Sequence, residues 1–321
     1  MTKTKAWISA MRLRTLPLSL SGIILGSFAA YALGFWNTTI FVLALLTTVF
    51  FQILSNLAND LGDSLKGADN ENRVGPQRAV QSGVISLKEM KIGVALFVVL
   101  SLACAIPLII IGTESMPQSM LIFYSVLALL CIIAAITYTV GKKAYGYHGM
   151  GDVMVYIFFG LVAVLGVFSL YTKSFKIETI FLANVIGFLS MAVLNLNNMR
   201  DHENDAAVGK NTLVVRIGFK NAKIYHTLLI LLALGSMLLF AITSTFYWSL
   251  FSTIPFILLF IHLVKVTRTD DAKALDPELK KVALSTFLLL SFHDVLLTLH
   301  LVQLATDFLC IFLPFRSIDS A

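Results

Sequence analysis

The chain has 321 residues, of which 58% are hydrophobic and 13% charged, and its mean hydropathy is +0.86. Ordinary globular domains carry about a quarter charged residues, so this composition argues against a soluble enzyme and predicts a membrane protein. The formal net charge of +6 requires no nucleic-acid partner, because membrane orientation and anionic lipid headgroups account for it.

Residues 1–15 place four basic side chains around Trp7, Ile8 and Met11, a pattern typical of an interfacial amphipathic segment that leads into the first span. Repeated apolar runs of about twenty residues follow, each long enough to cross the hydrocarbon core. The sequence therefore predicts one polytopic all-α domain over 1–321. Nine spans are expected, near 16–34, 38–58, 92–112, 119–140, 152–171, 178–197, 224–243, 247–266 and 282–305.

Basic residues are distributed unequally between the two sides of this bundle. Of the 24 Lys and Arg residues, all but Lys173, Lys176 and Arg316 lie in the N-terminal segment or in the loops after even-numbered spans. The positive-inside rule therefore predicts that the N-terminus and these loops face the cytoplasm and that the C-terminus lies outside, with the protein in the cytoplasmic (inner) membrane.

Two similar groups of acidic and amide residues lie at the expected cytoplasmic ends of the second and sixth spans. In the first, Asn56, Asp60 and Asp63 are spaced by four and three positions, which places them on one helix face. In the second, Asn197, Asp201 and Asp205 are spaced by four. Cytoplasmic loops 59–91 and 198–223 continue from these groups. An internal duplication explains the match and predicts that the two clusters face each other.

Like charges packed at this spacing near a membrane require compensation. Mg²⁺ binds through one or two carboxylates together with substrate phosphate oxygens and waters. The clusters are thus predicted to hold two metal ions bridged by a diphosphate, with Asp60, Asp63, Asp201 and Asp205 as the catalytic acids. Basic side chains near them are candidates for the remaining phosphate charge. These are Arg73, Arg78, Lys142, Lys143, Arg200 and Lys210.

Three segments together resemble the UbiA-type membrane prenyltransferases, and within them the 1,4-dihydroxy-2-naphthoate polyprenyltransferase branch. They read "QILSNLANDLGDSLKGADNENRVGPQRAVQSGVIS", "YTVGKKAYGYHGMGDVMVYIFFG" and "NNMRDHENDAAVGKNTLVVRIG". The resemblance implies nine helices around a central cavity that is capped by cytoplasmic loops. It also implies two Mg²⁺ ions, one held by Asn56, Asp60 and Asp63 and the other by the three matching residues of the second cluster.

The resemblance further implies a reaction between a polyprenyl diphosphate and 1,4-dihydroxy-2-naphthoate. Diphosphate and CO₂ leave, and demethylmenaquinone is formed in a step of menaquinone biosynthesis. Such a reaction needs an apolar cavity that keeps an allylic cation away from water. Tyr138 and Tyr147 are candidates to line it and to stabilise the cation through their ring faces.

Several alternatives stay open on the sequence alone. The acceptor could be another aromatic compound such as 4-hydroxybenzoate, and a secondary transporter is the rival from a different class, because acidic internal repeats also occur there. The outer ligand of the first cluster is either Asp63 or Asp69. His293, Asp294 and His300 in the ninth span have no assigned role. Prenyl chain length, a general base, the order of decarboxylation and prenylation, and the oligomeric state are undetermined.

Overall fold

The computed structural model describes residues 2–69, 78–244 and 247–312, and within these ranges the regular structure is helical. In the same ranges nine helical segments are long and apolar enough to cross a membrane, which confirms the predicted all-α membrane fold. The elements are α1 (Lys3–Met11), η1 (Leu13–Thr15), α2 (Leu16–Tyr31), α3 (Thr38–Leu65), α4 (Leu87–Thr113), α5 (Gln118–Thr137), η2 (Tyr145–His148), α6 (Gly151–Val155), η3 (Tyr156–Gly166), α7 (Val167–Thr172), α8 (Glu178–Ala207), α9 (Leu213–Ile217), α10 (Phe219–Thr243), η4 (Tyr247–Thr253), α11 (Phe256–Arg268), η5 (Ala272–Leu275) and α12 (Asp276–Phe312).

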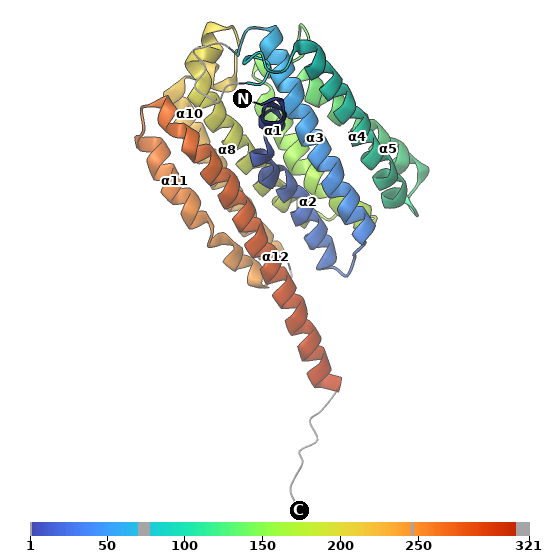
Figure 1. Ribbon diagram of the computed structural model, residues 1–321. Coiled ribbons are helices and arrows are strands. Elements are labelled where there is room, and N and C mark those ends of the chain that lie inside the picture. Colours follow the sequence, from blue (N-terminus) through green and yellow to red (C-terminus); the bar gives the residue numbers. More distant parts are fainter. Residues whose placement is uncertain (1, 70–77, 245–246, 313–321) are drawn as a thin grey trace, which may run out of the picture.

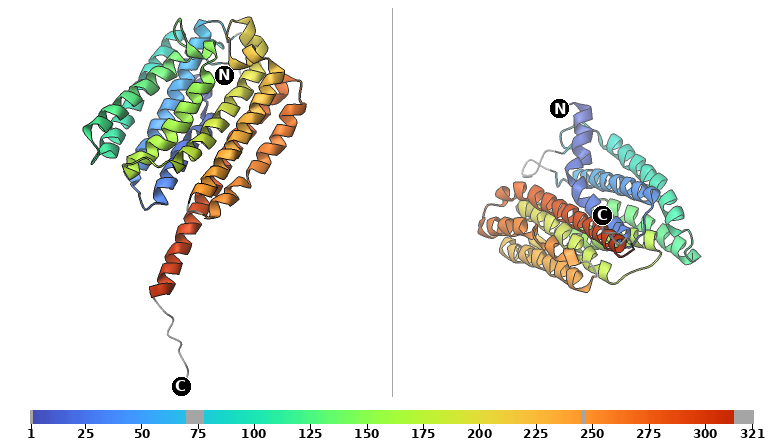
Figure 2. Two further views of the ribbon diagram at one scale, coloured as in Figure 1. Left: turned by 180° about the vertical axis from the view of Figure 1, so that it is seen from behind. Right: turned by 90° about the horizontal axis from the view of Figure 1, so that it is seen from below.

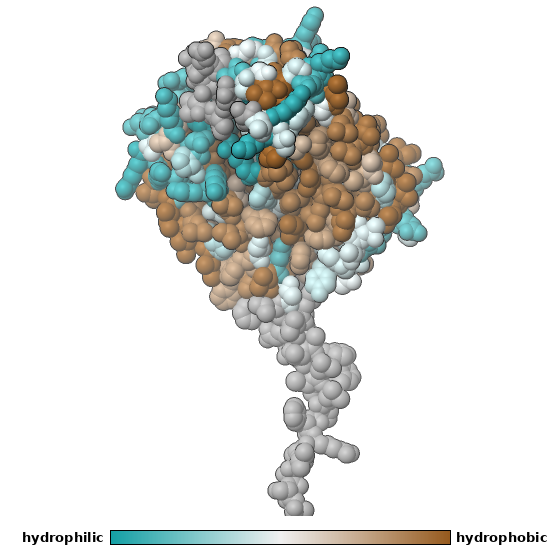
Figure 3. Space-filling view, viewed as in Figure 1, coloured by the Kyte–Doolittle hydropathy of each residue, from teal (hydrophilic) through white to brown (hydrophobic). Residues whose placement is uncertain are grey.

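The long helices run roughly alongside one another, whereas α1 crosses them at a steep angle near one end of the bundle (Figures 1 and 2). Arg12, in the left-handed conformation with φ 47°, ends α1 and turns the chain into α2. Hydrophobic side chains cover a broad band of the surface, and hydrophilic ones gather at the end where α1 lies (Figure 3). Exposed residues such as Ile92 and Val99 belong to this apolar surface, which suits contact with lipid.

The two helices that carry the acidic clusters are longer than the hydrocarbon core of a membrane is thick. The side chain of Asn37 accepts a hydrogen bond from the Ile40 N–H (3.1 Å) and caps the first turn of α3, which then continues for 28 residues; α8 continues for 30. At 1.5 Å per residue these helices are about 42 and 45 Å long, against a hydrocarbon core of roughly 30 Å. Their last turns therefore extend beyond the core, and the clusters lie on helix rather than in loops.

Helix α2 lies inside the bundle, where it contacts α3, α8, η3 and α12. Opposite it, η3 is a π-helix, a wider form that is frequent at functional sites. Close packing here depends on small residues. A Cβ atom at Gly160 in η3 would lie 2.7 Å from the Ala183 carbonyl oxygen and 2.9 Å from the Cα of Gly187, both in α8. This approach fixes η3 against the helix that carries the second cluster.

We expect Gly160→Ala to destabilise the fold by roughly 1–3 kcal/mol, because the new methyl group meets backbone atoms that cannot rotate away. The measurement is the midpoint of thermal unfolding in detergent. Gly235→Ala in α10 is the matched control, since a Cβ there has no neighbour within 4 Å. Equal unfolding midpoints for the two variants would contradict the close packing of η3 on α8.

Candidate active site

The acidic clusters at the ends of α3 and α8 are buried, although they lie at the polar end of the bundle. Asp60 is 1% exposed and Asp63 4%, and Asp201 and Asp205 are 6% and 4% exposed. A carboxylate taken out of water is stable only when it is paired or hydrogen-bonded. Each of the four has basic or hydroxyl partners, so the compensation that the sequence required is present.

Arginines from two other segments neutralise Asp60. Its Oδ1 atom forms ion pairs with Arg12, at the end of α1, and with Arg78 Nη1 (2.9 Å). The neighbouring amide of Asn56 donates to the Met11 carbonyl (2.9 Å), which ties α3 to the same turn. The N-terminal segment, expected only to lie at the membrane surface, therefore supplies a side chain to the first cluster.

Tyr147 and Lys210 connect the two clusters. The hydroxyl of Tyr147 donates to Asp63 (2.9 Å), and burial, together with this carboxylate, raises the pKa of Tyr147, so the hydroxyl stays protonated. Burial lowers the pKa of Lys210, but the carboxylates of Asp63 and Asp205 raise it by more, so the ammonium stays charged. Its Nζ lies 3.5 Å from Asp205. The charge of Lys210 thus interacts with carboxylates from both α3 and α8, which indicates that the clusters converge.

Loop contacts hold the two helix ends together. The side-chain amide of Asn204 in α8 donates to the Ala68 carbonyl after α3 (3.1 Å), and the Asn211 N–H donates to the Tyr147 carbonyl (3.1 Å). Ala68, Ala144, Tyr147 and Val208 form a small apolar cluster of their own. Segments from three distant parts of the sequence therefore pack into one cap over this end of the bundle.

Arg200 organises the second cluster. It binds Asp201 through two hydrogen bonds, from Nε to Oδ1 (2.9 Å) and from Nη2 to Oδ2 (2.6 Å). Its Nη2 also donates to Asn197 (2.9 Å), and its Nη1 donates to Asp276 at the start of α12 (2.6 Å). Because Arg200 is 3% exposed, these contacts are largely shielded from water and are stronger than those of a surface pair.

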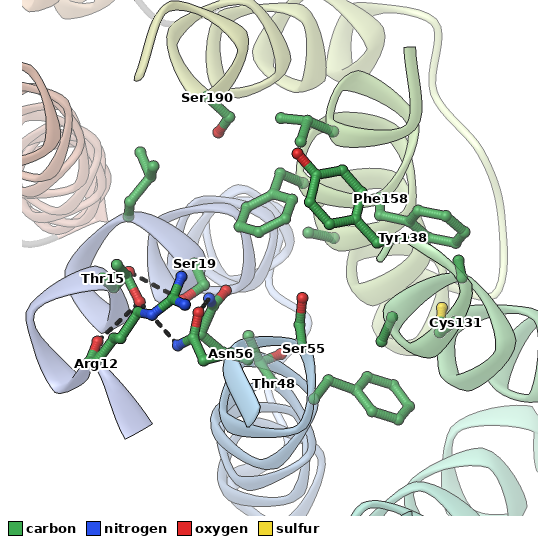
Figure 4. Close-up of a pocket in the computed structure, with 18 of the residues that line it drawn as sticks. Arg12, Thr15, Ser19, Thr48, Ser55, Asn56, Cys131, Tyr138, Phe158 and Ser190 are labelled. Atoms are coloured by element: carbon green, nitrogen blue, oxygen red, sulfur yellow. Dashed lines mark hydrogen bonds between the residues drawn. The ribbon is translucent and has the colours of Figure 1, made fainter. Parts of the chain in front are cut away.

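A cavity of about 770 Å³ extends into the bundle from the capped end, where Asn56, Asp60 and Asn197 line it. Asp63, Asp201 and Asp205 are outside the described lining. The polar end of the cavity includes Arg12, Asn56 and Asp60, and its apolar walls include Leu108 and Phe159. Figure 4 shows Ser190 and Tyr138 pointing into the cavity from the side opposite Arg12 and Asn56. A large apolar cavity with a few polar groups at one end suits a ligand with a charged head and a greasy tail.

The structure places the other predicted residues unequally around this cavity. Arg78, Arg200 and Tyr138 line it, and burial raises the pKa of Tyr138 to about 12. Tyr147 contacts Asp63 and is outside the described lining, while its ring lies beneath the ammonium of Lys66 (3.8 Å to the ring centroid).

Lys142 and Lys143 are exposed, and the described lining does not include them. Arg73 lies outside the described residues. Asp69 forms an ion pair with Arg78 (3.5 Å), which leaves its role as an outer ligand untested.

Sequence reasoning missed Arg12 and Asp276 as members of the site. Arg12 was assigned to membrane-surface binding because of its basic and apolar neighbours, and Asp276 lies 75 positions after Asp201 in a charged loop. No local pattern links either residue to the clusters. Their role follows from the packing of α1 and α12, and this packing cannot be predicted from residue spacing along the chain.

The donor set fits a hard divalent cation. The clusters offer only carboxylate and amide oxygens, the ligands that Mg²⁺ prefers, and their acids already attract buried positive charge. Among the described residues, no three His, Cys, Asp or Glu side chains gather closely enough to form a complete metal cage. A closed cage is not required, because Mg²⁺ keeps waters and takes phosphate oxygens from a substrate.

The chain matches the UbiA prenyltransferase family over residues 19–291. It belongs to this family. A 1,4-dihydroxy-2-naphthoate octaprenyltransferase of Haemophilus influenzae is 42% identical to it over 294 residues, which cover 89% of this chain and 94% of the relative. An Escherichia coli protein of the same name is 40% identical over 283 residues, 87% of this chain and 91% of the relative.

Solved structures of UbiA homologues share the fold. A homologue from Archaeoglobus fulgidus, bound to DMAPP and Mg²⁺, superimposes with a TM-score of 0.61 at 19% identity and covers 89% of this chain and 98% of that one. An apo homologue from Aeropyrum pernix K1 gives a TM-score of 0.61 at 14% identity, over 86% and 98% of the two chains. These likenesses confirm the helical architecture that the sequence motifs predicted.

We expect Arg200→Met to cost about 3–5 kcal/mol of folding free energy, because it leaves buried Asp201 without its guanidinium partner. Asp276→Asn is the comparison variant: it alters the same network, but the Asp276 side chain is 42% exposed, so its loss is expected to cost less. Chemical unfolding in detergent, followed by circular dichroism, measures both. If the two variants lost equal stability, Arg200 would not be the centre of the network.

Proposed function

We propose that this protein transfers a polyprenyl group from a polyprenyl diphosphate to 1,4-dihydroxy-2-naphthoate, with release of diphosphate and CO₂, and gives demethylmenaquinone for menaquinone biosynthesis. The observation that carries the proposal is a largely apolar cavity whose polar end is lined by Asn56 and Asp60 of the first cluster and Asn197 of the second. The four acids of the two clusters are buried at the same end of the bundle. The similarity to naphthoate octaprenyltransferases of two bacteria supports the choice of acceptor.

In this proposal each cluster holds one Mg²⁺ ion, and the diphosphate lies between them. The ligands are Asn56, Asp60 and Asp63 from α3 and Asn197, Asp201 and Asp205 from α8. When bound, Mg²⁺ supplies positive charge that stabilises the departing diphosphate. Lys210, which interacts with acids of both clusters, holds further positive charge at the same place. Metal bound to a relative together with a prenyl diphosphate supports the cofactor assignment.

Basic side chains at the polar end bind and orient the diphosphate. Arg78 and Arg200 line the cavity and present guanidinium groups, which suit bidentate phosphate contacts. Arg73, Lys142 and Lys143 belong to the loops of the cytoplasmic cap and remain candidates for the outer phosphate oxygens.

The cavity walls hold the prenyl chain and exclude water from the reacting carbon. The allylic carbon–oxygen bond breaks, and its electron pair leaves with the diphosphate. The electron-rich naphthoate ring forms the new carbon–carbon bond, and the carboxylate leaves as CO₂, which returns the ring to aromaticity. Tyr138, whose ring lines the cavity, stabilises developing positive charge on the prenyl group. Phe158, Phe159 and Leu108 shield that charge from water.

The nine membrane-spanning segments among the described residues place the protein in a lipid bilayer, and we propose the cytoplasmic membrane as its location. The basic residues around the clusters support an orientation in which the N-terminus and the cap face the cytoplasm and the C-terminus lies outside. Water-soluble naphthoate then reaches the polar end directly, while the prenyl chain enters from the bilayer.

We expect Asp60→Asn and Asp201→Asn each to lower the rate of prenyl transfer by at least about 100-fold, because each removes a charge that positions metal against the leaving group. The assay supplies purified protein with a long-chain polyprenyl diphosphate, 1,4-dihydroxy-2-naphthoate and either Mg²⁺ or EDTA, and quantifies prenylated naphthoquinol. EDTA should abolish wild-type activity.

Asp270→Asn, at an exposed aspartate that pairs with Lys223 far from the cavity lining, is the matched control and should retain wild-type activity. Prenylation of 4-hydroxybenzoate in place of the naphthoate would overturn the acceptor assignment. Wild-type rates in both cluster variants would overturn the two-cluster mechanism.

A further inference from the structure

The cavity contains more positive charge than its carboxylates neutralise. Five of the described lining residues are basic: Arg12, Arg14, Arg78, Arg200 and Lys280. Arg12 and Arg78 form ion pairs with Asp60, and Arg200 with Asp201 and Asp276. Arg14 and Lys280 are exposed at the edge of this lining and form no ion pair with any described carboxylate. The lining thus has two basic groups available for an anion besides those that contact the acidic clusters.

Arg14 and Lys280 lie on two neighbouring walls of the cavity. Arg14 lies in η1, the short helix that leads into α2, and Lys280 is in the second turn of α12, which packs against α2. The two helices also begin at the same end of the bundle (Figure 1). On α12, the lining positions Asp276, Leu279, Lys280 and Ala283 form one helix face. These two basic groups therefore flank the α2–α12 side of the opening, whereas Arg78 and Asp60 mark the α3 side.

A buried hydroxyl in the same cavity also has no partner. Ser190 in α8 is 2% exposed, lines the cavity and has no hydrogen bond to any described residue. Its side chain points into the cavity in Figure 4. A serine hydroxyl in a helix commonly donates to the carbonyl four residues earlier, as Ser236 does to Leu232 (2.8 Å). Ser190 forms no such bond, so its hydrogen-bonding capacity remains available to a ligand.

We infer that these three residues form the acceptor subsite: Arg14 and Lys280 bind the carboxylate of an aromatic acid, and Ser190 hydrogen-bonds a ring hydroxyl. The inference rests on the proposed function, which requires two anions, a diphosphate and an aromatic carboxylate. In the proposed function the diphosphate lies at the acidic clusters, where Arg78 and a metal held by the acids would bind it. The second anion then belongs at the two basic groups that contact no carboxylate, on the α2–α12 side.

The subsite accounts for how the acceptor is aligned. A carboxylate held at the rim and a hydroxyl held deeper fix two points of a flat ring, which limits its rotation in the cavity. Contacts of Arg14 and Lys280 with the carboxylate are made before reaction and lost when CO₂ leaves. They therefore favour substrate binding over product binding and should affect KM more than kcat.

The test compares Arg14→Gln, Lys280→Gln and Ser190→Ala with wild type in Mg²⁺ buffer. Equilibrium titrations use two probes, 1,4-dihydroxy-2-naphthoate and its analogue without the carboxylate, 1,4-dihydroxynaphthalene. Kinetics of prenyl transfer give KM for the naphthoate and for the polyprenyl diphosphate. Lys273→Gln is the matched control, because it also removes one exposed positive charge. Lys273 lies seven residues before Lys280 and is outside the described cavity lining.

We expect Arg14→Gln and Lys280→Gln each to raise Kd and KM for the naphthoate about fivefold to tenfold, as the loss of one charge-assisted hydrogen bond implies. Their affinity for dihydroxynaphthalene and their KM for the polyprenyl diphosphate should change less than about twofold. Ser190→Ala should weaken both aromatic probes equally, because both retain the hydroxyls. Lys273→Gln should behave as wild type.

Three results would overturn the subsite. KM rising for the diphosphate rather than the naphthoate would assign the two basic residues to the prenyl donor. Equal weakening of both aromatic probes in Arg14→Gln and Lys280→Gln would exclude a carboxylate contact. Unchanged binding would show that the two basic side chains do not contact the acceptor. The titrations measure binding and need no turnover. If the wild-type protein binds the naphthoate through these residues but does not prenylate it, the subsite is supported and the proposed reaction is contradicted.

Discussion

The arrangement of this protein depends on four carboxylates that are buried where a membrane bundle meets water. A carboxylate in such a place is stable only with a close cation or donor. Asp60 and Asp63 obtain theirs from distant parts of the chain, whereas Asp201 and Asp205 pair with Arg200 and Lys210 nearby in the sequence. Arg12 reaches Asp60 from the N-terminal turn, Lys210 interacts electrostatically with both Asp63 and Asp205, and Arg200 links Asp201 to the start of α12. Neutralising the acids therefore also assembles the cap.

This electrostatic requirement explains why the last turns of α3 and α8 are joined where the cavity opens. Helices α3 and α8 extend past the hydrocarbon core, and without the cap their last turns would have only water and loops around them. Hydrogen bonds from Asn204 and Asn211 to neighbouring backbone carbonyls, with Tyr147 packed between them, bring the two extensions together. The same contacts that satisfy buried polar groups thus bring the two sets of carboxylate and amide oxygens to one end of the bundle.

The chemistry divides along the axis of the cavity. Charged groups gather at the capped end, and aromatic and aliphatic side chains line the rest of the cavity. This division suits a substrate with a diphosphate head and a prenyl chain that needs shelter from water. Close packing at Gly160 and Gly187 holds η3, whose Phe158 and Phe159 line the cavity, against α8. The inferred acceptor subsite lies on the α2–α12 side, so donor and acceptor approach the reacting carbon from different walls.

The sequence by itself determined the membrane class, the spans and the two acidic clusters, because apolar length and the three-to-four residue spacing on a helix are local properties. It identified Asp60, Asp201 and their neighbours for the same reason. Only the tertiary structure decided that Arg12 and Asp276 belong to the site, that Lys142 and Lys143 are exposed beside the cap, and that Ser190 lacks a partner. Such facts depend on which distant helices pack together, and that packing follows from the shape and charge of whole surfaces rather than from spacing along the chain.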